Sequence, residues 1–216
     1  MRKHFLVVDD HPVFRQGLVA LIESDQAFSV VAEAGNSEEA LAALERSSLD
    51  IALVDISLDD ENGLDLVRTM RASHPDLPVL IISMHDEVVY AERTLKAGAR
   101  GLVMKQEPPS VVMSAIRSVL AGHIYLSDKM RDKMLESMVS ASREGDVALI
   151  DRLSEREIEV LEYLGQGYGA AEIAEILSLS VKTIHTYQEH LKEKLQLSSS
   201  TELRRFAVSW YRASHR

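Results

Sequence analysis

The first 120 residues alternate short apolar runs with amphipathic helical patterns, and few folds accept that order. Five runs rich in β-branched and other apolar residues occupy 5–10, 28–35, 51–55, 78–83 and 101–105. Helical patterns follow them at 11–24, 36–47, 62–73, 86–98 and 107–122. Short, continuous apolar runs are typical of parallel strands that are buried on both faces. The pattern predicts an α/β fold with a doubly wound, five-stranded parallel sheet.

Polar side chains that carry chemistry end four of these runs: Asp9, Asp10, Asp55, Ser83 and Lys105. In an open α/β sheet the ligand crevice lies outside the carboxyl ends of the strands, so these side chains are expected to converge. Three adjacent carboxylates raise one another's pKa, and a bound divalent cation removes that conflict. Mg²⁺ prefers oxygen ligands and accepts phosphate oxygens. The cluster predicts a Mg²⁺-assisted phosphoryl-transfer site with an aspartate acceptor.

Length and composition narrow the class of protein. The 216 residues are enough for two small domains, and the absence of cysteine excludes disulfides, thiolate metal sites and a cysteine nucleophile. The N-terminal apolar run meets acids too soon for a signal peptide, and no run approaches the roughly 18 apolar residues of a spanning helix. We expect a cytoplasmic protein that does not enter a membrane.

The net charge of −10 is unevenly distributed along the chain. Residues 1–125 carry 11 basic and 19 acidic residues, whereas residues 151–216 carry 9 and 10. The nearly neutral C-terminal third predicts modest non-specific affinity for DNA. DNA binding would therefore need dimerisation or a specific set of contacts.

The C-terminal third has a helical pattern throughout, with helices expected at 153–167, 170–180, 181–197 and 200–213. A capping box of Ser154 and Glu157 starts the first helix. A short helix, a tight turn and a longer polar-faced helix follow the helix-turn-helix plan. The predicted organisation is a domain at 1–125, a linker with an amphipathic helix at 126–150, and a second domain at 151–216.

Motifs in both halves resemble known families. The N-terminal half resembles a response-regulator receiver domain in VVDDHP (7–12), LVDISLDDENGLDL (53–66), IIS (81–83) and AGARGLVMK (97–105). The C-terminal part resembles the LuxR-type effector domain of the NarL/FixJ class in LSEREIEVL (153–161), EIAEILSLSVKTI (172–184) and EKLQL (193–197). The resemblance implies a flavodoxin-like receiver with strand order 2-1-3-4-5, followed by a small all-α helix-turn-helix domain of four helices.

The resemblance also implies a role for each polar residue at the strand ends. Asp55 becomes the aspartate that a cognate histidine kinase phosphorylates, and Ser83 and Lys105 bind phosphoryl oxygens. Mg²⁺ is held by the carboxylates of Asp9, Asp10 and Asp55 and by the backbone carbonyl of Ser57. The expected chemistry is limited to self-phosphorylation from a phosphodonor and slow self-dephosphorylation, so the chain is not expected to be an enzyme.

Two positions depart from the receiver pattern. Leu102 stands where the family has an aromatic switch residue, and Asp59, followed by two further acids, stands where a proline is usual. Without the aromatic residue, the switch is expected to run through the loop after Ser83 and the fourth helix. His85 occupies a position that tunes dephosphorylation in the family.

The third C-terminal helix separates into two faces. Its buried stripe is expected to contain Val181, Ile184, Leu191 and Leu195. Its exposed stripe, which is expected to read bases in the major groove, contains Lys182, His185, Thr186 and Glu189. Contacts to the DNA backbone are expected from Thr183, Tyr187, Gln188, Lys192 and Lys194.

These features predict a transcriptional regulator that dimerises on phosphorylation and binds promoter DNA, with RNA polymerase as a further partner. The fourth C-terminal helix is expected to provide a dimer surface or to close the core through Leu203, Phe206, Ala207 and Trp210.

Three other functions are compatible with parts of the sequence. A transcription factor that needs no phosphorylation is favoured by Leu102 and Asp59. An aspartyl-phosphate phosphotransferase would need an acid two residues after its nucleophile, where the chain has Ser57. An interaction adaptor would leave the helix-turn-helix unexplained.

Overall fold

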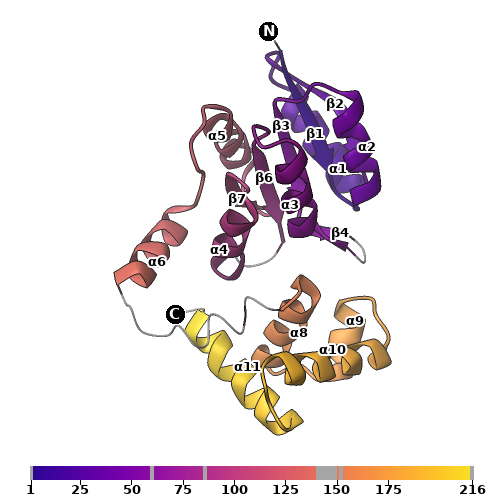
Figure 1. Ribbon diagram of the computed structural model, residues 1–216, viewed down its shortest axis with the longest axis vertical. Coiled ribbons are helices and arrows are strands. Elements are labelled where there is room, and N and C mark those ends of the chain that lie inside the picture. The colour runs from indigo at the N-terminus through magenta and orange to yellow at the C-terminus, as the bar shows by residue number, and fades with distance from the viewer. Residues whose placement is uncertain (1, 59–60, 85–86, 140–149, 151–152, 215–216) are drawn as a thin grey trace. The chain divides into compact units, whose positions relative to one another are not determined.

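The computed structural model describes residues 2–58, 61–84, 87–139, 150 and 153–214, which form two compact units (Figure 1). The first unit spans Met1–Met138 and the second spans Val139–Arg216. No helix in the described ranges is long and apolar enough to cross a membrane.

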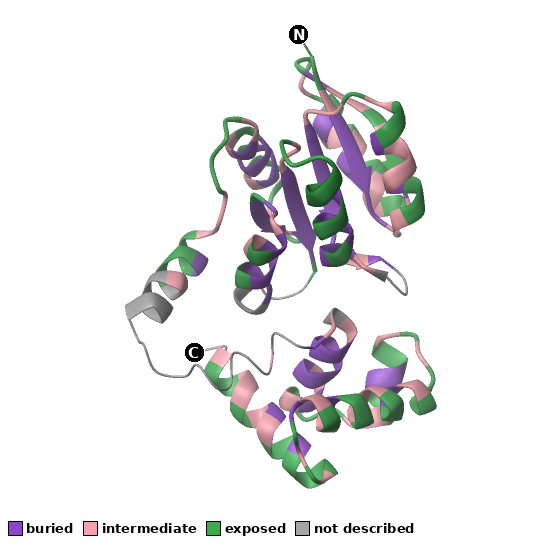
Figure 2. Ribbon diagram, viewed as in Figure 1, coloured by how far each residue is buried: buried purple, intermediate pink, exposed green. Residues whose placement is uncertain are grey.

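A five-stranded parallel sheet forms the centre of the first unit. Its strands are β1 (Lys3–Val8), β2 (Phe28–Ala34), β3 (Ile51–Asp55), β6 (Val79–Ser83) and β7 (Gly101–Met104). Their order in the sheet is β2-β1-β3-β6-β7. The predicted order 2-1-3-4-5 is therefore confirmed. Every residue of β3 and β6 is buried, which explains why these runs are continuously apolar (Figure 2).

Helices cover both faces of this sheet, as a doubly wound fold requires. They are α1 (Pro12–Glu23), α2 (Ser37–Arg46), α3 (Gly63–Ser73), α4 (Glu87–Ala97) and α5 (Pro109–Leu120). Apolar residues of α1 and α5, such as Ile22 and Ile116, pack in one core cluster with Phe5 and Leu53 of the strands. The side-chain oxygen of Asn36 accepts a hydrogen bond from the Glu39 amide at 2.9 Å and so caps the start of α2.

A small hairpin that the sequence pattern did not predict follows β3. Its strands, β4 (Ser57–Leu58) and β5 (Glu61–Asn62), pair antiparallel. Strands of two residues are too short to show a hydrophobic alternation, which is why the sequence pattern indicates no strand here. The predicted departure at Asp59 lies outside the described residues, as does His85.

The segment that follows α5, up to the beginning of α6, packs on the first unit. Tyr125 forms a backbone bridge with Gly101, and the Ser127 hydroxyl donates to Glu87 of α4 at 2.7 Å. The amphipathic helix expected in the linker is α6 (Asp128–Val139), and its Met130 is buried. The beginning of α6 therefore belongs to the core of the first unit.

The second unit contains four helices in the described range: α8 (Glu155–Gln166), α9 (Ala170–Ile176), α10 (Val181–Lys194) and α11 (Ser200–Ser214). The predicted capping box is present, because Ser154 and Glu157 bond reciprocally. Helix α11 packs against α8, where a Cβ on Gly165 would lie 2.7 Å from the Ala207 carbonyl oxygen.

Burial in the second unit matches most of the expected pattern. Ile184, Leu191 and Leu195 are buried, whereas Val181 is 42 % exposed. The expectation that Val181 is buried was wrong, because it is the first residue of α10 and precedes the turn that contacts the core. On α11, Leu203 and Ala207 are buried and therefore close the core, whereas Phe206 and Trp210 are half-buried.

Gly63 provides a test of how the fold holds the end of β3. A Cβ on Gly63 would lie 2.0 Å from the backbone oxygen of Asp55, a position that no side chain can occupy. We expect Gly63→Ala to lower the free energy of unfolding by about 3 kcal/mol or more, because the backbone after Asp55 must move. Urea denaturation measures this change.

Gly17→Ala is the matched control, since Gly17 lies within α1 and a Cβ there meets no atom within 4 Å. This variant should be as stable as the wild type or more stable by about 1 kcal/mol, because alanine favours the helix. Equal stability of the two alanine variants would contradict the close packing of Gly63 on Asp55.

Candidate functional site

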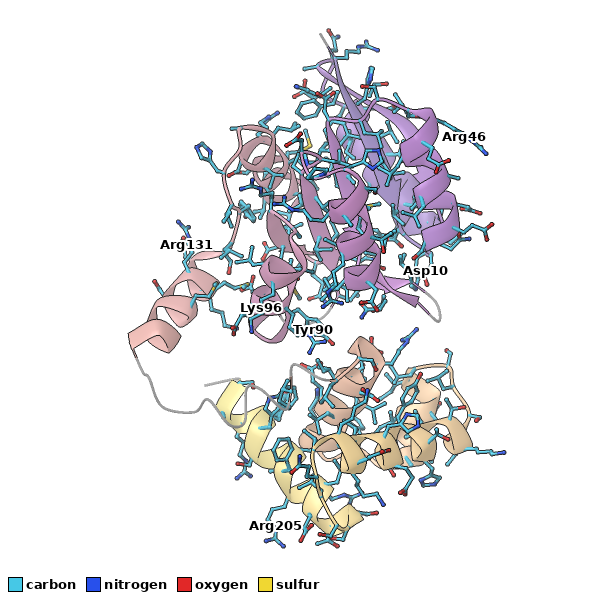
Figure 3. All side chains as sticks on the ribbon, viewed as in Figure 1. Asp10, Arg46, Tyr90, Lys96, Arg131 and Arg205 are labelled. Carbon is cyan, nitrogen blue, oxygen red and sulfur yellow. The ribbon has the colours of Figure 1, made fainter. Side chains whose placement is uncertain are left out.

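The three predicted carboxylates meet at the carboxyl edge of the sheet. Asp9 and Asp10 follow β1, and Asp55 ends β3, the strand that pairs with β1. Asp9 is 1 % exposed and Asp55 is 3 % exposed, while 9 % of the Asp10 side chain is exposed; Figure 3 labels Asp10. The parallel register brings residues that are 46 positions apart together, as the strand-end argument predicted.

Lys105 lies between two of these carboxylates. Its Nζ is 2.6 Å from Asp9 Oδ2 and 2.7 Å from Asp55 Oδ2, and its side chain is 4 % exposed. The same Nζ lies 4.4 Å from the centre of the Phe14 ring on α1, a cation–π distance. One ammonium therefore faces two buried carboxylates. Together these three groups carry a net negative charge, which a further cation can balance.

His11 belongs to the same cluster, although the sequence argument did not single it out. Its backbone amide donates to Asp9 Oδ1 at 2.9 Å, and its Nδ1 lies 2.6 Å from Asp10 Oδ1. Ligand atoms of Asp9, Asp10, His11 and Asp55 all lie within 4.8 Å of one another. Its position directly after the acid pair was the signal that could have identified it.

The electrostatics of Asp55 follow from its surroundings. Burial raises its pKa from 3.8 to about 6; the nearby Lys105 ammonium opposes the rise and the Asp9 carboxylate adds to it. A divalent cation nearby would favour the charged, deprotonated form of Asp55. Clustered carboxylate oxygens are the donors that Mg²⁺ prefers, so the residues present fit such an ion.

The remaining predicted receiver residues surround this cluster. The Ser57 amide donates to Asp55 Oδ1 at 3.3 Å, so Ser57 lies beside the acceptor. Ser83 is buried at the end of β6, and its backbone carbonyl accepts from the Lys105 amide at 2.7 Å. Leu102 is buried on β7, paired in register with Ile81 of β6. Among the described receiver residues, Ser57 and Ser83 thus lie at the same edge of the sheet as Asp55, whereas Leu102 lies within β7.

A buried aromatic residue near this sheet comes from a helix instead of from β7. Tyr90 lies on α4, the helix that packs against β7, and is fully buried (Figure 3). The helical pattern of residues 86–98 contained this tyrosine, but only the packing of α4 shows that it is in the core.

The second candidate site is the surface of α10. Lys182, His185, Thr186 and Glu189, the predicted base-reading residues, are all exposed. The residues expected to contact the DNA backbone are half-buried on its flanks: Thr183, Tyr187, Gln188, Lys192 and Lys194. The exposed stripe thus has the geometry that was predicted for a recognition helix.

Two of the lysines on α10 that are expected to contact the DNA backbone form ion pairs within the protein. Lys192 Nζ lies 2.8 Å from Glu189 Oε2. Lys194 Nζ lies 2.7 Å from Glu157 Oε2, and Glu157 is buried near the start of α8. This long-range pair ties the end of α10 to α8, a structural role that the sequence did not indicate.

Comparison with known proteins identifies both halves of the chain. Residues 5–117 match the response regulator receiver domain, and residues 151–207 match the bacterial regulatory proteins of the luxR family. The chain is a LuxR-family response regulator. Such regulators control transcription and are not conventional enzymes.

Relatives of this response regulator match it over nearly its whole length. The transcriptional activator protein ExaE of Pseudomonas putida is 37 % identical over 203 residues, which cover 94 % of each protein. The oxygen regulatory protein NreC of Staphylococcus haemolyticus is 32 % identical over 207 residues, covering 94 % of this chain and 95 % of NreC.

Solved structures share the fold. A LuxR-family response regulator from Aurantimonas sp. is 31 % identical and aligns with a TM-score of 0.61 over 65 % of this chain and all of that one. RcsB from Salmonella enterica, solved on promoter DNA with a phosphomimetic, is 24 % identical with a TM-score of 0.60, covering 97 % of this chain and all of RcsB.

The raised pKa of Asp55 predicts a pH-dependent stability effect. Between pH 3.8 and about 6 the folded protein holds a proton that the unfolded chain releases, so stability due to this group is lost as pH rises through about 6. In the absence of divalent cations, we expect Asp55→Asn to raise the free energy of unfolding by about 3 kcal/mol at pH 7.5 and by little at pH 4.

Asp50→Asn serves as the control of opposite sign. A hydrogen bond from Lys3 lowers the pKa of Asp50, so removal of its charge should destabilise the fold at pH 7.5. Urea denaturation at both pH values gives the comparison. An Asp55→Asn variant no more stable than wild type at pH 7.5 would show that the buried charge is not destabilising.

Proposed function

We propose that Asp55 accepts a phosphoryl group from a cognate histidine kinase or a small phosphodonor, and that this event controls DNA binding. The observation that carries the proposal is the Lys105 ammonium held between Asp55 and Asp9 at the edge of the sheet. A buried acceptor carboxylate, a fixed cation and a neighbouring acid pair are the parts that phosphoryl transfer to an aspartate needs.

The transfer forms one bond and breaks one. An oxygen of Asp55 attacks the phosphorus atom, the phosphorus–nitrogen bond of the donor phosphohistidine breaks, and the imidazole keeps the electron pair and takes up a proton. We propose that Lys105 and the Ser83 hydroxyl then bind two phosphoryl oxygens, both being beside Asp55 at the ends of neighbouring strands. Hydrolysis by water regenerates the carboxylate and releases inorganic phosphate.

We propose Mg²⁺ as the ion of this site, with Asp9, Asp10, Asp55 and the backbone carbonyl of Ser57 as its protein ligands. When bound, it supplies positive charge next to the transferred phosphoryl group. The chain itself fixes its carboxylates for this purpose: His11 and Lys105 hold Asp9, and the Ser57 amide holds Asp55.

We further propose how the signal leaves the receiver. The phosphoryl group adds about 1.5 to 2 negative charges, which draws Lys105 and the Ser83 loop toward it and shifts α4. Two chains then pair on promoter DNA, each with the exposed stripe of α10 in the major groove. RcsB, which shares the fold, has been solved as dimers bound to DNA. RNA polymerase would be a further partner, and the site of action would be the cytoplasm.

The proposed domains follow the two compact units. We propose a receiver at 1–125, a linker at 126–150 and a DNA-binding domain at 151–216. The compact unit that ends at Met138 supports a linker whose first part, α6, is carried on the receiver.

Phosphorylation has a direct test. Full-length protein incubated with Mg²⁺ and acetyl phosphate should gain about 80 Da, the mass of one phosphoryl group, because Asp55 is the proposed acceptor of the cluster. Asp55→Ala protein, or wild type in excess EDTA, should gain nothing. Intact mass spectrometry measures the gain, and Asp76→Ala, which changes an exposed acid of the same domain, is the control that should retain it.

A wild-type protein that gains no mass would favour the second candidate function, a transcription factor without phosphorylation control. The observation that favours this alternative is the buried Leu102 at the position of the family's aromatic switch residue. In that case DNA binding by the wild type and by Asp55→Ala would be the same.

The proposed role of α10 in recognising DNA bases leads to a separate prediction. Glu189 is exposed, and a carboxylate accepts a hydrogen bond from cytosine N4, so Glu189→Gln should relax the preference at one base pair of the selected site by about 1–3 kcal/mol. Selection of binding sites from a random duplex pool measures this preference. Glu45→Gln, which changes an exposed acid of α2 in the first unit, should leave the selected sequence unchanged.

A further inference from the structure

An aromatic ring lies against the charged cluster at the edge of the sheet. Phe14 belongs to the first turn of α1, is half-buried, and packs against the core cluster of the first unit. The Nζ atom of Lys105 lies over its ring, 4.4 Å from the ring centre. The proposed phosphoryl transfer gives this ring no role, although it contacts the cation of the site.

The ammonium of Lys105 has three N–H donors. Two carboxylates, those of Asp9 and Asp55, lie 2.6 and 2.7 Å from its nitrogen. The ring of Phe14 is a further partner, because its face carries the negative part of the ring quadrupole and attracts a cation within about 6 Å. Only 4 % of the Lys105 side chain is exposed, so water screens this attraction weakly.

A ring holds an ammonium without neutralising it. A third carboxylate in the place of Phe14 would cancel the positive charge that Lys105 needs for its proposed contact with a phosphoryl oxygen. The ring is neutral, so the ammonium remains available to an anion. An aliphatic side chain would fill the same space but would offer the ammonium no such attraction.

The two acids that hold Lys105 have other partners in the proposed reaction. An oxygen of Asp55 bonds to phosphorus, and Asp9 is a proposed metal ligand. Each carboxylate then attracts the ammonium less strongly, because its negative charge is shared with another group. The charge distribution of the Phe14 ring does not change in this step. Its contact therefore matters more in the transition state than in the resting site, which is the condition for accelerating a reaction.

A hollow beside the site offers the ammonium another position. This cavity of about 610 Å³ is lined by Phe14, Lys105 and mainly apolar residues. Its other polar lining residues, among those that the structure describes, are His11 and Glu107. Without the ring, an ammonium whose acids are engaged elsewhere would turn into this hollow, toward water or toward the carboxylate of Glu107. The ring lowers the population of that unproductive arrangement.

We propose that Phe14 is a positioning residue of the phosphoryl-transfer site, and that its ring face holds the Lys105 ammonium toward Asp55 while the phosphoryl group is transferred. The proposal rests on the proposed role of Asp55 as the acceptor and adds a residue to that reaction. Phe14 touches no reacting atom and acts through Lys105.

Fluorinated phenylalanines test the electrostatics of the ring at nearly constant shape. Fluorine withdraws electron density from the ring face, so mono-, di- and trifluorinated phenylalanine at position 14 weaken the attraction stepwise. Full-length protein is incubated with Mg²⁺ and acetyl phosphate, and intact mass spectrometry follows the phosphorylation rate. The rate should fall with each added fluorine, and Phe14→Leu, which has no ring, should be about 2- to 30-fold slower than the wild type.

Trifluorinated phenylalanine in place of Phe28 is the matched control. Phe28 is buried in the same unit, where its ring contacts the ring of Phe5 at a centre-to-centre distance of 5.0 Å. This protein should be phosphorylated at the wild-type rate. A slow Phe14→Leu variant together with wild-type rates for all three fluorinated rings at position 14 would show that only the shape of the ring matters, and would overturn the proposal.

A double-mutant cycle measures the contact without the reaction. Urea denaturation without divalent cations compares the wild type, Phe14→Leu, Lys105→Met and the double variant. Phe14→Leu should raise the unfolding equilibrium constant about 2- to 30-fold more in the wild type than in the Lys105→Met protein, which has no ammonium to hold. Equal effects in the two backgrounds would overturn the proposal. If Phe14→Leu does not fold, the trifluorinated protein takes its place in the cycle.

The outcomes separate this proposal from the acceptor role of Asp55. A wild type that gains no mass would overturn the acceptor role, and the positioning role with it. A wild type that gains mass, at a rate that does not depend on fluorination at position 14, would overturn only the role of Phe14. Rates that fall with fluorination, together with energetic coupling between Phe14 and Lys105, would support both.

Discussion

The ammonium of Lys105 between Asp9 and Asp55 is the interaction on which the receiver half depends. Two carboxylates and one cation are buried together, with nitrogen–oxygen distances of 2.6 and 2.7 Å. The charge is not balanced within the cluster, and the pKa of Asp55 is raised to about 6 as a result of its burial and of Asp9. A further cation beside these carboxylates would favour the charged form of Asp55, in agreement with the proposed Mg²⁺ site.

Packing around the sheet makes this arrangement possible. Gly63 lies so close to the backbone of Asp55 that no side chain fits, and the Lys105 amide bonds the carbonyl of Ser83 on the neighbouring strand. Asp55, Ser83 and Lys105 are thus fixed at the ends of three adjacent strands. A change of charge at Asp55 reaches β6 and β7 directly, and α4 packs on β7. A buried carboxylate also joins two elements in the second unit. Glu157 accepts a hydrogen bond from the backbone at the start of α8 and forms an ion pair with Lys194 of α10.

Much of the fold could be predicted because the strands are buried on both faces. Continuous apolar runs such as 51–55 and 78–83 are typical of such strands, and two of the helices carry recognisable caps, Asn36 and Ser154. The short hairpin around residues 57–62 could not be predicted, because its two-residue strands carry no periodicity. Val181 was misplaced because a helical wheel ignores where the contact with the core begins.

The sequence by itself determined which chemical groups end the strands and which face of α10 is polar, since both follow from short-range periodicity. Tertiary structure alone decided how these groups are paired. It placed the Lys105 ammonium between Asp9 and Asp55, buried Tyr90 of α4 in the core, and engaged Lys194 with Glu157. Periodicity reports which face of an element is buried, whereas ion pairing depends on distances between residues far apart in the chain. Only the packed structure fixes those distances.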